Sequence, residues 1–295
     1  MKKSFSTRFI KESITKPIFE KYIIIFVLAL FSLSALANPR LASKKQIGMF
    51  LNSKTCVVID NGSMLYNVFV KNAVEKHWKL TEFEFIDRQE FDKRRFNSKY
   101  SFIVLMKVIF DKDPSGVSYD YLNLVLGDSS KNITDMPELC SIPLSYSNNN
   151  NIKYGYVIPS IIKFMQIHVN TLSKKHFRIS LEGLKYYNST KSLKKKELLL
   201  NKDMMAMDAN STEKINTVYK HKVKLMTTSE IESELANNNA INYYNFHVGP
   251  SPDSETGKCF DMIFDTAGNL YYFNSRKITN DNKDGFNQKD LSQIW

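Results

Sequence analysis

One order of predicted elements occurs twice in the chain, and this repetition constrains the fold more than any single motif does. The first copy covers residues 55–128 and the second covers residues 197–273. Each copy reads as an apolar strand, a helix, a short strand, a second helix and then longer strands joined by a turn. Few residue identities are shared, but the order of elements and the positions of the turns agree. The repetition therefore predicts an internal repeat of two similar lobes.

The pattern inside each copy predicts an α/β fold. Cys56 to Ile59 form a continuous apolar run, which is typical of strands covered on both faces in parallel sheets. A long strand at 100–110 is followed by a Pro-Ser-Gly turn and a returning strand at 119–126, which predicts an antiparallel hairpin. We expect two similar three-layer lobes, each with a mostly parallel sheet plus an antiparallel hairpin, and each enclosing its own core. A bridging helix that begins near Pro159 is expected to join them.

The division of the chain follows from this pattern and from its length, since 295 residues suit about two domains. We expect a signal peptide at 1–37 and a first lobe with the bridging helix at 50–184. A polar, basic linker is expected at 185–196, and the second lobe with a carboxyl-terminal tail at 197–295.

The amino terminus has the three parts of a secretory signal. A basic stretch ends at Lys21, an apolar stretch runs from Tyr22 to Ala37, and Ala35-Leu36-Ala37 fits the small-residue cleavage pattern. We expect cleavage after Ala37 and export to the bacterial periplasm or beyond the cell. The alternative is an uncleaved amino-terminal anchor, which would be the protein's route to a membrane.

Helix-capping residues recur at the expected helix starts. Ser63, Asp87, Ser229 and Asn287 are each placed to cap a helix, with Glu90 the partner of Asp87 and Glu232 the partner of Ser229. Caps that agree with the order of strands and helices support the predicted architecture.

Polar residues near the carboxyl ends of the predicted strands are the candidate ligand-binding residues. In open α/β sheets, ligands gather at this edge. Turn formation by Asp60 and helix capping by Asp87 are the favoured explanation for these two side chains, and a small binding site is the alternative. The residues are Asp60, Asn61, Ser63, Asp87 and Asp203.

No catalytic residue, metal site or cofactor is assigned from the sequence. The five histidines lack zinc-site spacing, and the glycine-rich phosphate-binding patterns are missing. Asn280, Asn282 and Asp284 precede Gly285 with the spacing of a calcium loop, but the twelfth position is Leu291 where Glu is needed. We read this segment as a turn before a capped helix.

The cysteines and the net charge limit which classes of protein and of binding partner the sequence fits. An odd count (Cys56, Cys140 and Cys259) with no C-x-x-C pair argues against a disulfide framework. We expect three small buried hydrophobic side chains, although one bridge is possible after export. The net charge of +11 favours weak attraction to anionic surfaces such as lipid headgroups or acidic glycans, and no specific nucleic-acid site is indicated.

The stretch AVEKHWKLTEFEFI, followed by DRQEFDKRRF and YSFIVL, resembles uncharacterised exported proteins of Bacteroidetes-type bacteria. The resemblance is clearest from Val57 to Leu105. The segment FEFIDRQEF is also similar to the amino-terminal α/β modules of TolB-like and curli-secretion-type envelope proteins, whose glycine-rich middle is missing here. These resemblances imply an envelope location and an α/β fold, and neither carries a catalytic residue across.

Three functions remain open at this point. The leading hypothesis is a non-catalytic exported envelope protein whose two lobes bind a protein partner. The second is a small-molecule receptor that uses the cleft between the lobes and closes by a hinge. The third is a hydrolase that depends on carboxylates such as Asp60 and Asp87.

Overall fold

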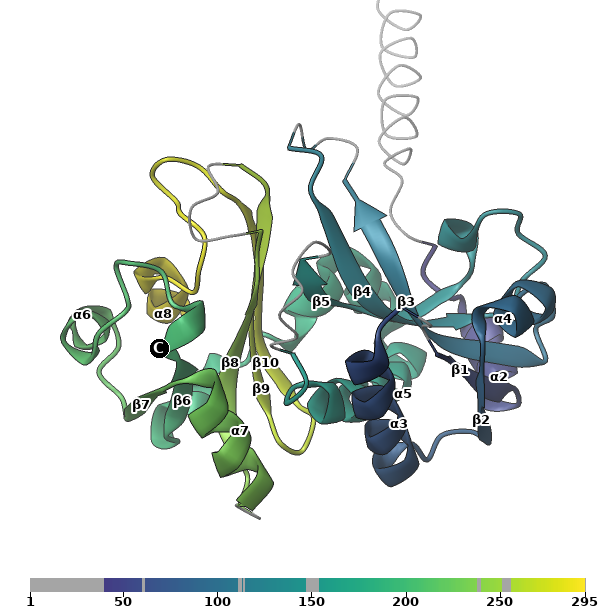
Figure 1. Ribbon diagram of the computed structural model, residues 1–295, viewed down its shortest axis with the longest axis horizontal. Helices are drawn as coiled ribbons and strands as arrows, with labels where there is room; N and C mark the ends of the chain where they lie inside the picture. The colour runs from purple at the N-terminus through teal and green to yellow at the C-terminus, as the bar shows by residue number, and fades with distance from the viewer. Residues whose placement is uncertain are drawn as a thin grey trace, which may run out of the picture. The chain divides into compact units, whose positions relative to one another are not determined.

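The computed structural model describes residues 40–59, 62–110, 113, 115–146, 154–237, 240–250 and 256–294 (Figure 1). The predicted signal peptide and the predicted site residues Asp60 and Asn61 lie outside the described residues. Among the described helices, none is both long enough and apolar enough to cross a lipid bilayer.

The first lobe is built on a five-stranded mixed sheet with the strand order β2-β1-β3-β4-β5. β1 lies between β2 and β3 and is parallel to both, whereas β4 and β5 continue the sheet as antiparallel strands. The elements of this lobe are α2 (Lys44–Leu51), β1 (Lys54–Val58), α3 (Met64–His77), β2 (Phe83–Ile86), α4 (Arg88–Arg94), β3 (Tyr100–Ile109), β4 (Ser118–Leu126), the 3-10 helix η2 (Ile133–Asp135) and β5 (Glu138–Tyr146).

The second lobe repeats this topology with the strand order β10-β9-β8-β6-β7. In each lobe the first strand lies between the second and third and is parallel to both, and the last two strands are antiparallel. The expected pair of similar α/β lobes is therefore confirmed. The elements are β6 (Leu198–Asn201), η5 (Lys202–Met204), α6 (Thr212–Val218), β7 (Val223–Met226), α7 (Thr228–Asn237), β8 (Tyr243–Val248), β9 (Lys258–Asp265), β10 (Leu270–Lys277) and α8 (Gln288–Gln293).

Helices cover both faces of each sheet because successive strand residues point to opposite sides. In β1, Cys56 and Val58 pack with Phe91 of α4, whereas Val57 packs on the other face with α3. In the second lobe, α6 and α8 cover one face of the sheet and α7 covers the other. Each lobe thus has three layers.

A long helix, α5 (Ile158–Glu182), lies between the two sheets (Figure 1). Its first two thirds carry buried side chains on every turn, as expected for a helix that is covered on several sides. Phe164 is fully buried, and its ring lies 5.9 Å from that of Phe264 in β9. α5 also packs against β5 of the first lobe. The expectation of two separate cores is therefore wrong, because α5 joins residues of both sheets in one hydrophobic cluster.

A second contact between the lobes is made by Tyr119 of β4. Its hydroxyl donates to the Lys258 carbonyl at 2.6 Å and accepts from the Lys258 amide at 2.8 Å. The hydroxyl therefore satisfies both backbone groups of the first residue of β9, as a neighbouring strand would. The Tyr119 ring also packs edge-on against Phe260, with centroids 5.5 Å apart. Aromatic packing and backbone hydrogen bonds together fix the lobes to each other.

The helix caps are partly as predicted. Asp87 and Asn287 cap α4 and α8 through their side chains. Ser63 stands at the start of α3 but makes no capping hydrogen bond. The predicted pairing of Ser229 with Glu232 is wrong: Thr227 accepts from the Glu230 amide, and the Glu230 carboxylate accepts from the Thr227 amide at 2.7 Å. The reciprocal box is thus formed two residues earlier than expected.

The segment between the lobes, residues 185–196, lies mostly in two 3-10 helices, η3 (Gly183–Tyr187) and η4 (Thr190–Lys195). Leu193 is buried in the second core cluster, and Tyr187 packs against the shared core. Ser189 donates its amide to the Tyr271 carbonyl, which places this segment beside β10.

We expect Phe164→Ala to destabilise both lobes together. Removing a buried aromatic ring costs about 3–5 kcal/mol, and this ring belongs to the core that the two lobes share. Chemical denaturation followed by tyrosine fluorescence and by circular dichroism should give one transition shifted to lower denaturant.

Phe177→Ala on the same helix is the matched control. Phe177 is 74% exposed, so its removal should change the free energy of unfolding by less than about 0.5 kcal/mol. Two separate transitions in the Phe164 variant, one of them unshifted, would contradict a shared core.

Candidate functional site

Of the predicted site residues that the structure describes, Asp87 and Asp203 lie in different lobes. Asp87 follows β2 in the first lobe and accepts from the Glu90 amide at 2.8 Å. Asp203 lies in the second lobe, where its carboxylate accepts from the amide and hydroxyl of Thr228 at 3.0 and 2.9 Å. Both carboxylates therefore stabilise helix starts, which favours the capping interpretation for these two residues.

The calcium-like segment takes part in a different interaction. Within the residues that the structure describes, no cluster of His, Cys, Asp and Glu side chains could hold a metal ion. Asn282 donates its side-chain amide to the Lys277 carbonyl, and Asp284 contacts the ring of His247. The three cysteines are buried and free, so the sulfur atoms remain thiols.

A buried ionic cluster joins the last three strands to the carboxyl-terminal segment. His247 of β8 donates from Nδ1 to Asp261 of β9 at 2.6 Å and from Nε2 to Asp284 at 2.9 Å. Arg276 of β10 lies 3.4 Å from Asp261 and 3.7 Å from Asp290 of α8. All five side chains are at least nine-tenths buried.

The charge of His247 is set by its two carboxylate neighbours. Burial alone lowers the pKa of the imidazole, but Asp261 and Asp284 outweigh burial and raise it to about 10. Burial outweighs the opposing effects of His247 and Arg276, so the pKa of Asp261 is raised to about 6. At neutral pH the imidazolium is therefore paired on both sides. With both ring nitrogens occupied, His247 has no lone pair available for general-base chemistry.

The close approach of Asp284 requires a glycine opposite it. A Cβ atom on Gly249 would lie 1.9 Å from Asp284 Oδ1, which is inside van der Waals contact. The cluster thus depends on the absence of a side chain at Gly249 as well as on charge. It holds the segment after β10 against the sheet.

Sequence reasoning missed this cluster although a clue was present. Asp261 interrupts the apolar run CFDMIF, and His247 follows Phe246 within the strand run YYNFHV. A charged residue inside a buried strand needs a partner, because an unpaired buried charge is very costly. The two strands are adjacent and place His247 opposite Asp261, a pairing that only the register reveals.

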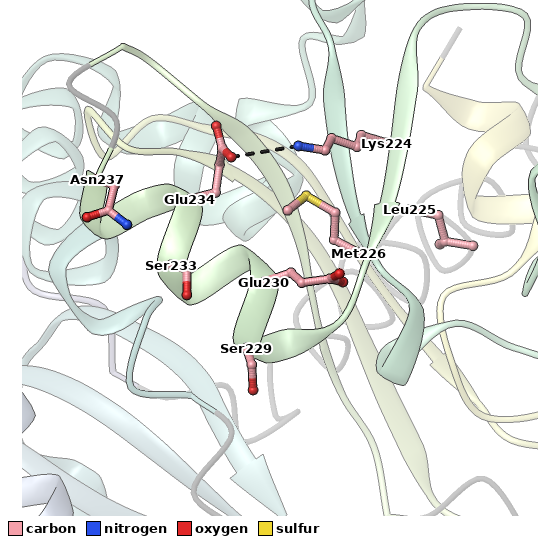
Figure 2. A pocket seen from close by; sticks show the side chains of 8 residues that line it. All are labelled: Lys224, Leu225, Met226, Ser229, Glu230, Ser233, Glu234 and Asn237. Atoms are coloured by element: carbon pink, nitrogen blue, oxygen red, sulfur yellow. Dashed lines mark ion pairs between the residues drawn. The ribbon is translucent and has the colours of Figure 1, made fainter.

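A surface groove lies between β7 and α7 (Figure 2). It has a volume of about 750 Å³. Figure 2 shows Lys224 and Met226 pointing from the strand toward the helix, while Leu225 points to the other side. The helix contributes one polar face to the groove, made of Ser229, Glu230, Ser233, Glu234 and Asn237.

The edge of β7 beside this groove is open. Among the described residues, β7 pairs with β6 on one side and with no strand on the other. Leu198 donates its amide to the Lys222 carbonyl, so Lys222 and Lys224 direct their backbone groups toward β6. Alternate residues of a parallel strand direct these groups to opposite sides, and Val223 and Leu225 therefore direct theirs outward.

The corresponding place in the first lobe is bridged more tightly. There Arg94 of α4 donates to Glu84 of β2 at 2.8 Å and to Glu90 at 2.9 Å. In the second lobe the charges are reversed, since Lys224 of β7 faces Glu234 of α7, and the single ion pair is 3.7 Å long. Glu230 is turned back to cap Thr227 and does not cross the groove. Lys224 and Glu234 thus form a longer ion pair across the β7–α7 groove than Arg94 forms with Glu84 in the first lobe.

No protein-family model matches the chain, and no curated protein or solved structure matches it either. The resemblance to exported Bacteroidetes-type proteins stays a prediction.

We expect the stabilising effect of His247 to disappear at alkaline pH. Its pKa rises from an ordinary value of 6.5 to about 10 on folding. A raised pKa gives stability that is fully present below about 6.5 and is lost as the pH climbs through about 10. The difference in free energy of unfolding between the wild type and His247→Gln should therefore be largest near pH 6.5 and shrink toward pH 10.

Urea denaturation at several pH values measures this difference. Asp284→Asn keeps the shape of the partner but removes its charge, so the dependence should move to lower pH in that variant. A difference between wild type and His247→Gln that stays constant from pH 6.5 to pH 10 would show that the imidazole is neutral in the folded state.

Proposed function

We propose that the protein is a non-catalytic, exported envelope protein that binds an extended segment of a partner protein along the open edge of β7. The observation that supports this most is the coincidence of that edge with the β7–α7 groove. A peptide that adds a strand to an open sheet edge gains main-chain hydrogen bonds, and the neighbouring pocket selects its side chains.

The chemistry of the groove defines the kind of segment that fits. The backbone groups of Val223 and Leu225 would pair with the added strand. Side chains on the α7 side of the added strand would meet Met226 and the ion pair of Lys224 with Glu234. The partner is therefore an extended segment whose side chains on that face combine an apolar residue with charged or polar ones.

The way the lobes are joined favours a rigid platform over a closing cleft. α5 shares its core with both sheets, and Tyr119 binds the backbone of β9. The β7–α7 groove is lined by the second lobe alone, and a second groove, beside Arg40 and Asp128, is lined by the first lobe alone. For these reasons partner docking is preferred to a hinged small-molecule receptor and to a carboxylate-dependent hydrolase.

We expect Leu225→Pro to weaken partner binding. Proline removes the outward N–H of residue 225, whereas the ladder with β6 uses the N–H groups of residues 224 and 226. Loss of one main-chain hydrogen bond, at about 1 kcal/mol, corresponds to roughly a fivefold loss of affinity. The test is capture of envelope proteins on the immobilised chain, followed by affinity measurement with the protein captured.

Leu225→Ala is the matched control, because it removes the same side chain but keeps the N–H. The proposal requires that Leu225→Ala keeps the wild-type affinity for the captured protein and that Leu225→Pro binds it roughly fivefold more weakly. A photo-crosslinker at Ser233 should also react with that protein, while one at the exposed Met207 should not. Equal affinity of both variants, or equal crosslinking at both positions, would refute strand addition at β7.

A further inference from the structure

The end of α5 forms an exposed surface that the partner-binding proposal does not use. Lys175 departs from helical backbone angles (φ −122°, ψ 29°) and marks a kink in the helix. Before the kink α5 is buried between the sheets, and after it Ile179 is the residue of α5 that remains buried. Phe177 and Leu181 are 74% and 71% exposed. Residues at i and i+4 of a helix lie on the same face, so these two large apolar side chains are neighbours.

The surroundings of this apolar pair are strongly basic. Residues 174–185 hold four lysines and arginines and one acidic residue, Glu182. Lys174, Lys175 and Lys185 are exposed. Arg178 donates to Glu182 at 3.2 Å and lies over the ring of Tyr186, which leaves the other cations of the segment uncompensated by that carboxylate. A cluster of this size beside an amphipathic helix is typical of contact with anionic lipid headgroups.

The first described residues of the chain lie beside this surface. His176 Nε2 is 3.0 Å from the carbonyl oxygen of Ala42, so Ala42 is next to the residue that precedes Phe177. The apolar stretch Tyr22–Ala37 ends three residues before Arg40. Three peptide units span at most about 11 Å. In an uncleaved chain, an apolar stretch inserted in a membrane would therefore keep Arg40, and with it the end of α5, close to the lipid surface.

We propose that Phe177, Leu181 and the surrounding lysines form a docking surface for an anionic lipid bilayer. The apolar pair enters the boundary between headgroups and acyl chains, and the lysines contact the phosphates. Nucleic acid is a poorer occupant, because an extended polyanion gives no reason for two exposed aliphatic and aromatic side chains at one helix face. This surface shares no residue with the groove at β7.

An environment-sensitive dye at position 177 tests the proposal directly. Burial raises the pKa of all three native thiols, that of Cys56 to about 11, so a maleimide dye at neutral pH should react with Phe177→Cys in preference to them. The full chain is reconstituted into vesicles of phosphatidylcholine alone or mixed with phosphatidylglycerol. The dye should shift to the blue several-fold more in the anionic vesicles.

Three further measurements decide between occupants. At about 1 M salt, where the screening length falls to about 3 Å, the shift should be largely lost. Adding Lys174→Gln, Lys175→Gln and Lys185→Gln should reduce the lipid-dependent shift at least roughly tenfold, since each cation near an anionic surface contributes about 1 kcal/mol. The same dye at Met207→Cys, a 76% exposed position in the second lobe, should not respond to the lipid.

Several results would overturn the proposal. Equal shifts in neutral and anionic vesicles would show tethering without headgroup recognition. A shift with double-stranded DNA and none with anionic vesicles would assign the surface to nucleic acid. A concentration-dependent shift without vesicles would assign it to a second copy of the chain. Unchanged circular dichroism in every variant ensures that none of these outcomes comes from unfolding.

Discussion

The burial of α5 between two sheets is the constraint on which the remaining structure depends. A helix with one apolar face can cover one sheet, but a helix apolar on several faces must be covered on several sides. Ile161, Phe164 and Met165 of α5 are fully buried in the cluster that contains both β5 and β9 residues. Moving the lobes apart would therefore expose apolar side chains of this helix to solvent. The lobes act as one body, and their other contacts, such as Tyr119 with Lys258, are built on that fixed arrangement.

The fold was predictable where local patterns carry the information. The order of strands and helices in residues 55–128 and 197–273 matches the two sheets, and Asp87 and Asn287 cap helices as predicted. The shared core was not predictable in the same way, because the apolar residues of α5 indicate burial without indicating against what. The box of Thr227 with Glu230 was missed because the sequence TTSEIE allows two capping registers. The common strand order is what an internal repeat requires, and the repeat itself stays a prediction.

Sites made of distant residues were harder to predict than elements. His247, Asp261, Asp284 and Arg276 come from three strands and a loop, and no spacing in the sequence connects them. Buried charges of this kind are expensive unless each is paired, and breaking one pair leaves the others uncompensated. The cluster therefore specifies how the segment after β10 lies on the sheet more than it adds net stability. Residues 280–284 thus have the spacing of a calcium loop, but Asp284 binds His247 and so fixes this segment to the sheet.

The two lobes share a topology but differ at the second strand and helix, and this difference gives them different surface properties. In the first lobe Arg94 spans from α4 to Glu84 of β2 with short hydrogen bonds, and its planar guanidinium can satisfy two carboxylates at once. In the second lobe Lys224 supplies the cation from the strand, and a lysine reaches only one carboxylate at 3.7 Å. An exposed single pair of this type contributes about 0–1 kcal/mol, so replacing it by contacts with a partner costs little. Both β2 and β7 are edge strands, and under our proposal the weaker bridge beside β7 makes that edge the easier one for an incoming strand to use.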